Sequence, residues 1–287
     1  MAAREAGHIQ ETPAVKIVSE PTIIPLASMA LDPDGVRALA EWVAETRPEC
    51  LPGGVLDYAF GYGLFPHDGT DDGRTLTHNE LLAELCGRNC YHSYGEKAGR
   101  KSNAAYTARM LGHGGMMPHA SVFYHAKMSF FFAGISRRMT HELIRHYVGA
   151  DRTEEGSPSQ ESTRYTRHPG TFSAHPATLN NERAWYHFKQ SVEQAYGQYI
   201  RFVDACESDY IKENNKPARG TDRKRIYESA AQILPGAACT SMIWTTNPMA
   251  LAKMFAERCH SSADLEFQRF ARKLRKCCYG RWPNLFA

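Results

Sequence analysis

Apolar and aromatic side chains recur at three- and four-residue intervals between residues 185 and 210, and this pattern constrains the fold more than any other. The series consists of Trp185, Phe188, Val192, Tyr196, Tyr199, Val203, Cys206 and Tyr210. Side chains at this spacing lie along one side of an α-helix, so we predict one long helix. A stripe that contacts a cofactor is the alternative, but a stripe of this kind is usually part of a core.

Capping residues and turn residues divide the first half of the chain. Residues 1 to about 30 are expected to be a loose lead-in. Asp34 could cap a helix whose apolar positions are Val36, Leu39, Ala40 and Val43. The Gly-, Pro- and Asp-rich stretch 52–73 is typical of a long loop. Thr77 and Glu80 have the spacing of a capping box and predict the start of a second helix.

The second half alternates strand and helix signals. Residues 121–132 are rich in Val, Phe and Tyr and predict a strand. Ser136 can cap a helix that continues to about Tyr147. A further helix is expected from Asp222 to Leu234, because the ring of Pro235 prevents its continuation.

Three shorter helices are expected to close the chain, and the helix at 222–234 is the first of them. A strand at 241–245 precedes the second, for which Asn247 is the cap and Pro248 the first residue. The third should begin near Ser262 and point three side chains inward: Leu265, Phe270 and Leu274. We therefore predict an α+β fold with a sheet flanked by the long helix and by the helix that starts after Ser136, most simply as one elaborated domain of 287 residues.

Charge and cysteine content limit the partners. The formal net charge is +3, which requires neither a nucleic acid nor a membrane as partner. Residues 1–11 lack the apolar region of a signal peptide, and the clearly apolar stretch 130–135 is too short to cross a bilayer. Eight cysteines in a chain of this length favour reduced thiols and a cytoplasmic location.

Two patterns suggest a metal site, and neither is convincing. Cys86, Cys90 and His92, with Cys277 and Cys278 downstream, could support a zinc-stabilised binding module, but no CxxC pair is present. The run 141–146, HELIRH, resembles a zinc protease motif. Its two histidines are five residues apart and diverge by about 140° on a helix, so they cannot share a metal. We predict no metal.

The helix after Ser136 carries a polar side formed by Arg138, Glu142, Arg145 and His146. A solvated surface helix with internal ion pairs would give the same pattern. The stretch that follows favours a binding role, because it combines Ser162, Thr163 and Arg164, and hydroxyls beside an arginine suit a phosphate.

These segments resemble the signature of the ThyX flavin-dependent thymidylate synthases. The resemblance rests on Thr140 to His146, Ser159 to Tyr165, Gly87 to Tyr91, Gly112-His113, His119 to Val122, Leu234-Pro235, Asn247, Arg258 and Glu266. It implies a ThyX-like fold over 76–287, with 1–75 as an N-terminal extension and loop-rich lead-in. It also implies a homotetramer with shared active sites, FAD as cofactor, NADPH as reductant and methylenetetrahydrofolate as carbon donor.

The resemblance assigns residues to two ligands. The nucleotide, UMP or dUMP, would be bound by Glu142, Arg145, Gln160, Glu161, Ser162, Thr163, Arg164 and Arg258. The cofactor would be bound by Arg145, His146, Tyr147, Val148, Gln160, Asn247 and Lys253. A helix N-terminus at Asn247 also suits the pyrophosphate or carbonyl groups of a cofactor.

Arg258 matches the arginine that activates the pyrimidine. Carbon 5 of uracil is a weak nucleophile, and a fixed cation at N3 and O4 favours the enolate-like form that places electron density on this carbon. A simple salt bridge to Glu257 or Asp264 is the alternative. No cysteine lies in a convincing nucleophile setting.

Departures from the family pattern leave the substrate open. Tyr147 replaces an arginine, and 14 residues separate it from Ser162 where seven are usual, an insertion of about seven residues around 149–158. Gly115, Pro118, Ala231 and Met249 replace ligand-contacting residues, and Lys253 is a candidate for a replacement charge.

Some relatives in nucleoside-antibiotic pathways of the polyoxin type methylate UMP, so we lean slightly towards UMP. An ordinary thymidylate synthase that makes dTMP from dUMP is the alternative. A relative that binds flavin or nucleotide without catalysis is the alternative of another class.

Overall fold

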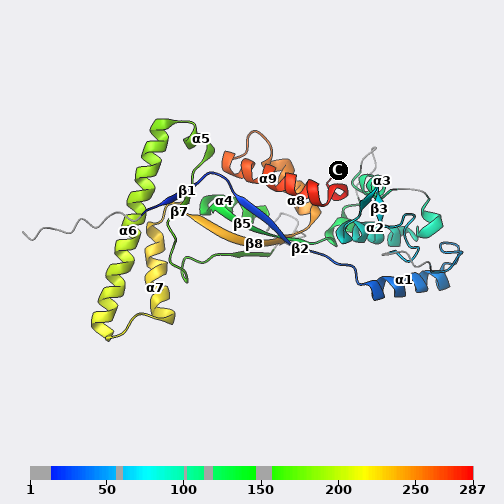
Figure 1. Ribbon diagram of the computed structural model, residues 1–287, viewed down its shortest axis with the longest axis horizontal. Helices are drawn as coiled ribbons and strands as arrows, with labels where there is room; N and C mark the ends of the chain where they lie inside the picture. The colour runs from blue at the N-terminus through cyan, green and yellow to red at the C-terminus, as the bar shows by residue number, and fades with distance from the viewer. Residues whose placement is uncertain (1–13, 56–60, 100–101, 113–118, 147–156, 287) are drawn as a thin grey trace, which may run out of the picture. The chain divides into compact units, whose positions relative to one another are not determined.

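The computed structural model describes residues 14–55, 61–99, 102–112, 119–146 and 157–286. The chain divides into two compact units. Unit 1 comprises Met1–Thr22, Phe132–Ile144 and Ser159–Met242; unit 2 comprises Ile23–Phe131, Arg145–Pro158 and Ile243–Ala287. Helices and strands both contribute to the fold (Figure 1), which confirms the expected mixture of helix and sheet.

Three sheets are present in the described ranges. Four strands have the order β2-β5-β8-β6, with bounds β2 Thr22–Ser28, β5 Met128–Ser136, β8 Cys239–Thr246 and β6 Ser157–Gln160. β1 (Lys16–Val18) pairs in parallel with β7 (Thr171–Ser173). β3 (Thr70–Asp71), inside the stretch expected to be loop, forms a small antiparallel pair with β4 (Arg74–Thr75), which directly follows that stretch.

The strands correct two expectations. The strand predicted at 121–132 begins only at Met128, because Ala120–Tyr124 forms a 3-10 helix, η2. The lead-in to residue 30 was expected to be loose, but it contributes β1 and β2. The strand predicted at 241–245 is confirmed within β8.

Unit 1 is organised by the long helix α6 (Glu182–Asn214), which confirms the first prediction from the sequence. The shorter α7 (Gly220–Ala230) lies beside it (Figure 1) and continues as the 3-10 helix η4 (Ala231–Ile233), close to the predicted 222–234. α5 (Pro176–Leu179) precedes them. The middle of the aromatic stripe is core, because Val192, Tyr196, Tyr199 and Val203 are buried, whereas Trp185, Phe188, Cys206 and Tyr210 are half-buried. The other buried residues of this core are Phe172, Tyr227, Ala230 and Ala238.

Unit 2 begins with two capped helices. α1 (Pro33–Thr46) is capped by Asp32 and not by Asp34, which lies in the first turn. α2 (His78–Tyr91) starts at the predicted capping box of Thr77 and Glu80. Their core consists of Val36, Ala40, Val43, Cys50, Leu51, Leu64, Phe65, Leu76, Leu81, Leu85 and Tyr94. Two short helices follow, η1 (Gly95–Ala98) and α3 (Asn103–Met110).

The C-terminal part of unit 2 contains α8 (Pro248–Arg258), α9 (Leu265–Arg281) and η5 (Pro283–Leu285). Asn247 caps α8 through a hydrogen bond from the backbone N of Ala250, as predicted. α9, which was predicted to begin near Ser262, begins at Leu265 with Asp264 as its cap. Phe270 and Leu274 are buried, whereas Leu265 is 40% exposed, so its predicted inward direction is wrong.

The predicted helix after Ser136 is shorter than expected. Ser136 accepts a hydrogen bond from the backbone N of Met139 and caps α4 (Arg137–Leu143), as predicted. The chain then tightens into the 3-10 helix η3 (Ile144–His146). Tyr147, where the helix was expected to end, and most of the insertion lie outside the described residues.

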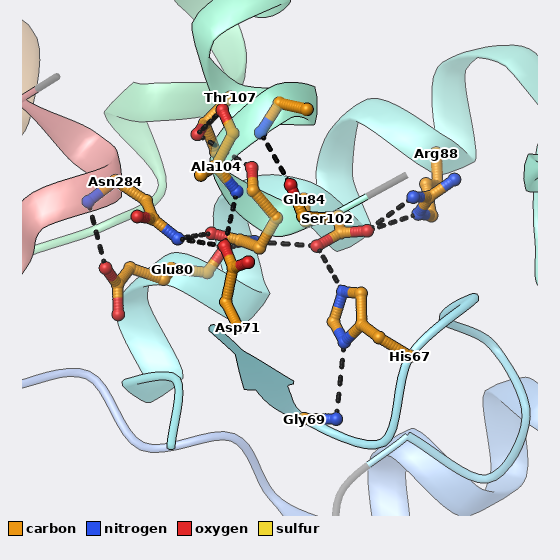
Figure 2. A network of polar contacts seen from close by, with 12 residues as sticks. His67, Gly69, Asp71, Glu80, Glu84, Arg88, Ser102, Ala104, Thr107 and Asn284 are labelled. Atoms are coloured by element: carbon orange, nitrogen blue, oxygen red, sulfur yellow. Dashed lines mark hydrogen bonds and ion pairs between the residues drawn. The ribbon is translucent and has the colours of Figure 1, made fainter. Parts of the chain in front are cut away.

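A buried polar network ties the C-terminal end of the chain to α2 and α3 within unit 2 (Figure 2). Glu84 is fully buried and accepts hydrogen bonds from Arg88 Nε at 2.7 Å and Asn103 Nδ2 at 2.6 Å. The oxygen that accepts from Asn103, Oε2, also lies 2.9 Å from Nε2 of His67. Asn284 Nδ2 donates to Asp71 at 3.0 Å. Burial raises the pKa of Glu84, but His67 and Arg88 outweigh this effect and lower it overall.

α6 has the length of a membrane span, but charged residues recur throughout its sequence. Within the described ranges, no helix combines the length and the apolar character needed to cross a membrane.

Candidate functional site

Arg258 and His146 form a direct contact within unit 2. Arg258 is the last residue of α8, and its Nε donates a hydrogen bond to Nε2 of His146 at 2.7 Å. The Arg258 guanidinium also lies over the ring of Phe267, with its carbon 4.9 Å from the ring centroid. The His146 ring meets the same Phe267 ring edge to face at 83°. The guanidinium of Arg258, the residue expected to activate the pyrimidine, is therefore fixed by a hydrogen bond at one edge and by a ring contact on one face.

His146 lies among positive charges. Its side chain is only 7% exposed, and burial is the first cause that lowers its pKa below the ordinary value. The charge of Arg258 acts in the same direction, followed by Lys253 and Arg145, while Glu257 opposes them from 3.8 Å. A neutral imidazole with an unprotonated Nε2 is the form that can accept the bond from Arg258.

Asn247 offers a donor at the start of α8. Its side-chain oxygen caps the helix, while its Nδ2 is buried and has no hydrogen-bond partner among the residues that the structure describes. The hydroxyl of Thr246 is also buried without a hydrogen-bond partner among the described residues. Buried donors are rarely left without a partner in proteins. A bound ligand with acceptor atoms would satisfy Asn247.

The predicted phosphate-binding residues form a turn in unit 1. The backbone carbonyl of Ser162 accepts from the backbone N of Tyr165 and of Thr166, and its hydroxyl accepts from the backbone N of Arg164 at 3.3 Å. Arg164 is exposed, and its guanidinium carbon lies 5.7 Å from the Tyr165 ring centroid. Thr163 is half-buried within the same turn.

Gln160 and Glu161 are fixed by their own unit. Gln160 Nε2 donates to the hydroxyls of Thr140 and Thr240, both at 3.3 Å. Glu161 faces Ser241, which donates its backbone N and its hydroxyl to the carboxylate. These contacts hold the start of the 160–164 segment in a defined position.

The polar side predicted after Ser136 is accessible only in part, because His146 is largely buried. Arg138 and Arg145 are exposed and Glu142 is half-buried, while Met139 and Leu143 are buried on the other side. Glu142 belongs to unit 1, with residues 160–164. Arg145 and His146 belong to unit 2, with Asn247, Lys253 and Arg258. Tyr147, Val148, Gly115 and Pro118 lie outside the described residues.

The residues of unit 2 fit a flavin nucleotide. The buried Asn247 Nδ2 requires an acceptor, which ring carbonyl and phosphate oxygens supply. Arg145, Lys253 and Arg258 provide the positive charge that a pyrophosphate needs. Asn247, Arg145, His146 and Lys253 are thus chemically suited to the cofactor role expected of them.

Two cysteines considered for a zinc site, Cys86 and Cys277, are held as neutral thiols. Burial raises the pKa of the Cys86 thiol to about 11 and also raises that of Cys277. A raised pKa leaves the thiol protonated and unreactive at neutral pH. Across the described ranges, no three His, Cys, Asp or Glu side chains are arranged to hold a metal ion.

Several contributors were not identified from the sequence. Phe267 supports both Arg258 and His146. Arg137 donates from Nη2 to the backbone carbonyl of Glu161 at 2.7 Å. The position of Arg137 directly after the cap Ser136 was the available signal for it. Phe267 gave none, because its spacing is that of an ordinary core residue.

The cations that surround the buried imidazole of His146 suit an anionic ligand. Comparison with known proteins makes this specific. The family described as thymidylate synthase complementing protein, Thy1, matches residues 74–284. The chain belongs to this family, that of the flavin-dependent thymidylate synthases.

Individual relatives agree with the family. The flavin-dependent thymidylate synthase of Mycolicibacterium vanbaalenii is 31% identical over 208 residues, which cover 72% of this chain and 78% of the relative. The enzyme of the same name from Mycobacterium tuberculosis is 30% identical over the same shares.

Solved structures show a similar fold. The UMP/dUMP methylase PolB from Streptomyces cacaoi, bound with 5-Br UMP, matches with a TM-score of 0.57 and 14% identity over 95% of both chains. The same protein bound with 5-Br dUMP matches with a TM-score of 0.53 and 17% identity over 95% of both chains. The similarity supports the ThyX-like fold predicted from the sequence motifs.

Proposed function

We propose that this protein methylates carbon 5 of a uracil nucleotide, with FAD as cofactor, NADPH as reductant and methylenetetrahydrofolate as carbon donor. UMP is slightly favoured over dUMP as substrate. The proposal includes a homotetramer with shared active sites, a cytoplasmic location and a catalytic domain at 76–287 preceded by an extension. Family membership supports the reaction type. The similarity of fold to a protein named UMP/dUMP methylase supports both UMP and dUMP as candidate substrates.

The contact between Arg258 and His146 is the observation that carries the proposal. A guanidinium fixed at one edge and one face can present a constant charge to the O4 and N3 edge of a uracil ring. Charge placed there stabilises the enolate-like form in which carbon 5 is the nucleophile. This activation needs no thiolate that attacks carbon 6 as a nucleophile.

The exchange of atoms balances with the named reactants. Carbon 5 forms a bond to the methylene carbon of the folate, both carbon–nitrogen bonds between this carbon and the folate break, and the hydrogen on carbon 5 leaves as a proton. FAD, when bound, carries the two electrons of NADPH that reduce the transferred carbon to a methyl group. The products are the 5-methyl nucleotide, tetrahydrofolate and NADP⁺.

The remaining residues are assigned by the same proposal. The nucleotide is bound by Glu142, Arg145, Gln160, Glu161, Ser162, Thr163, Arg164 and Arg258. The cofactor is bound by Arg145, His146, Tyr147, Val148, Gln160, Asn247 and Lys253. Hydrogen bonds from the charged groups are worth about 1.5 to 3 kcal/mol each, so Lys253 can offset only part of the loss of two family arginines at Ala231 and Met249.

A side-by-side assay of tritium release from carbon 5 of labelled UMP and dUMP tests the substrate. We expect release from both, faster from UMP, and only when methylenetetrahydrofolate and NADPH are present. The purified protein should be yellow, and NADPH should bleach it. A colourless protein that cannot be reconstituted with FAD would contradict the proposal, and exclusive turnover of dUMP would identify an ordinary thymidylate synthase.

Replacement of Arg258 tests the proposed activator. Arg258→Ala should abolish turnover while nucleotide binding remains measurable by calorimetry, because other residues hold the phosphate. Arg183→Ala, at an exposed position of α6, is the matched control and should retain turnover. Retained turnover in Arg258→Ala would show that another group activates the pyrimidine.

A non-catalytic relative that binds flavin or nucleotide is the second candidate. The observation that favours it is the absence of arginine at Ala231, in η4, and at Met249, in the first turn of α8. Binding of FAD and UMP without tritium release under any combination of co-substrates would support this candidate over the enzyme.

A further inference from the structure

The hydrogen bond between His146 and Arg258 lies at the atom that controls the orientation of the guanidinium. The Nε–H bond lies in the plane of the guanidinium group, so an acceptor at Nε fixes the rotation of this plane. The Phe267 ring contacts its face. These two contacts constrain both the tilt and the rotation of the Arg258 head group.

We propose that His146 is a positioning residue for Arg258, and that it acts as a neutral imidazole with its proton on Nδ1. The inference rests on the proposed function, in which Arg258 activates the pyrimidine. It assigns His146 a task towards another side chain, beyond the contact with the cofactor expected from the family. Arg258 always donates at Nε, so Nε2 of His146 must accept and cannot carry a proton.

The surroundings of His146 favour this neutral form. From α8, the groups that face it are Lys253, Glu257 and Arg258; from its own segment, Arg145; and from α9, the uncharged ring of Phe267. Three cations against one carboxylate, together with burial, lower the pKa of His146. The Glu257 carboxylate, 3.8 Å from Nδ1, lies on the side where the proton is expected.

Protonation of His146 should therefore release Arg258. An imidazolium has no acceptor, and two cations in contact repel each other. The rate of methyl transfer should fall as the pH drops through the lowered pKa of His146, although Arg258 keeps its charge throughout. The fall in rate at low pH would then reflect the lost orientation of the Arg258 guanidinium and not a loss of its charge.

Two substitutions separate orientation from the other roles of His146. His146→Leu removes the acceptor, and His146→Gln retains an acceptor oxygen that does not titrate. We expect His146→Leu to lower kcat roughly 10- to 100-fold, the effect of a small misplacement of a reacting group, with the Kd of the nucleotide nearly unchanged. His146→Gln should recover most of the rate and lose the acid limb. His187→Leu, at an exposed position of α6, is the matched control and should behave as wild type.

The flavin content of each variant distinguishes positioning from cofactor binding. Visible absorbance measures the FAD occupancy of His146→Gln and His146→Leu, and kcat is compared per bound flavin so that a loss of cofactor does not enter the rate. If the loss of rate in both variants follows the loss of flavin alone, His146 only binds the cofactor and the inference is wrong. An unchanged acid limb in His146→Gln would also overturn it.

The decisive measurement is the rate of a double variant at His146 and Arg258, compared with the rates of the two single variants. Lysine carries a methylene group at the position of the arginine Nε, so in an Arg258→Lys background the bond that fixes the guanidinium plane is absent. His146→Leu should therefore add little to Arg258→Lys, while independent roles would make the two rate losses multiply. Multiplied losses would refute the inference.

A measurement without turnover keeps this inference separate from the proposed function. Nitrogen-15 NMR of the holoenzyme, with the His146 signal assigned from His146→Gln, should show a neutral ring protonated on Nδ1. Arg258→Ala should raise the pKa of His146, because the nearest cation is removed. If the wild type releases no tritium but this pKa shift is observed, the proposed function is wrong, whereas the contact between His146 and Arg258 is supported. A ring protonated on Nε2 would overturn the inference itself.

Discussion

At the scale of the residue, Glu84 shows how a buried charge depends on its partners. Its carboxylate is fully buried and contacts Arg88, Asn103 and His67. Glu84→Gln would leave the Arg88 guanidinium, which is 1% exposed, without its counter-charge. Such a change costs about 3 to 5 kcal/mol. We expect this fall in the free energy of unfolding, measured by urea denaturation at pH 7.5.

A surface pair provides the control for that substitution. Glu193 lies 3.8 Å from Lys189 on the exposed side of α6, and exposed pairs of this type contribute about 0 to 1 kcal/mol. Glu193→Gln should therefore hardly change the midpoint of unfolding. Equal effects of Glu84→Gln and Glu193→Gln would show that the buried network does not stabilise the protein.

Single residues were predictable from the sequence where their partners are near in the chain. Ser136 and the pair of Thr77 and Glu80 were identified because a cap bonds to the next turn. The contact between His146 and Arg258 spans 112 positions, and that between Asn284 and Asp71 spans 213. No local pattern indicates such pairs, so the sequence marked His146 and Arg258 separately and missed their contact.

At the scale of the element, the capping box at the start of α2 can be tested directly. The Thr77 hydroxyl accepts from the backbone N of Glu80 and donates to the buried Glu80 carboxylate at 2.8 Å. Thr77→Ala should lower the free energy of unfolding by about 1 to 2 kcal/mol. Thr46→Ala, at the exposed C-terminal end of α1, is the control and should cost less. The opposite order would contradict the role of the cap.

The errors at this scale have local physical causes. Residues 121–124 have the composition of a strand, yet they form the 3-10 helix η2, since Val122 and Phe123 can be buried in either conformation. β1 was not predicted, because a strand of three residues is too short to show an alternation of apolar and polar side chains. It also depends on pairing with β7, more than 150 residues away. α6 was predicted well because its long pattern repeats many times.

At the scale of the whole molecule, the class of fold was accessible from the sequence but the order of the strands was not. Helices with caps and long periodicity are encoded locally, whereas the order β2-β5-β8-β6 joins strands from distant parts of the chain. The residues assigned to the two ligands followed from separated motifs in a fixed order. Their surroundings, such as the burial that sets the protonation of His146, come only from the folded chain.

Protonation of buried histidines should limit the stability of the molecule in acid. Burial is the first cause that lowers the pKa of both His146 and His168 in the folded state. In the unfolded chain both titrate near pH 6.5. As the pH falls below this value the unfolded state binds protons that the folded state does not, so the free energy of unfolding decreases until the lowered folded pKa values are passed.

Urea denaturation at pH 7.5, 6.5 and 5.5 and constant ionic strength measures this loss. The midpoint should fall from pH 6.5 to pH 5.5, and His146→Gln should show a smaller fall because one of the two groups no longer titrates. His187→Leu should follow the wild type, since this side chain is exposed. A midpoint that rises on acidification would mean that these histidines gain protons on folding. That result would also remove the basis for a neutral His146 beside Arg258.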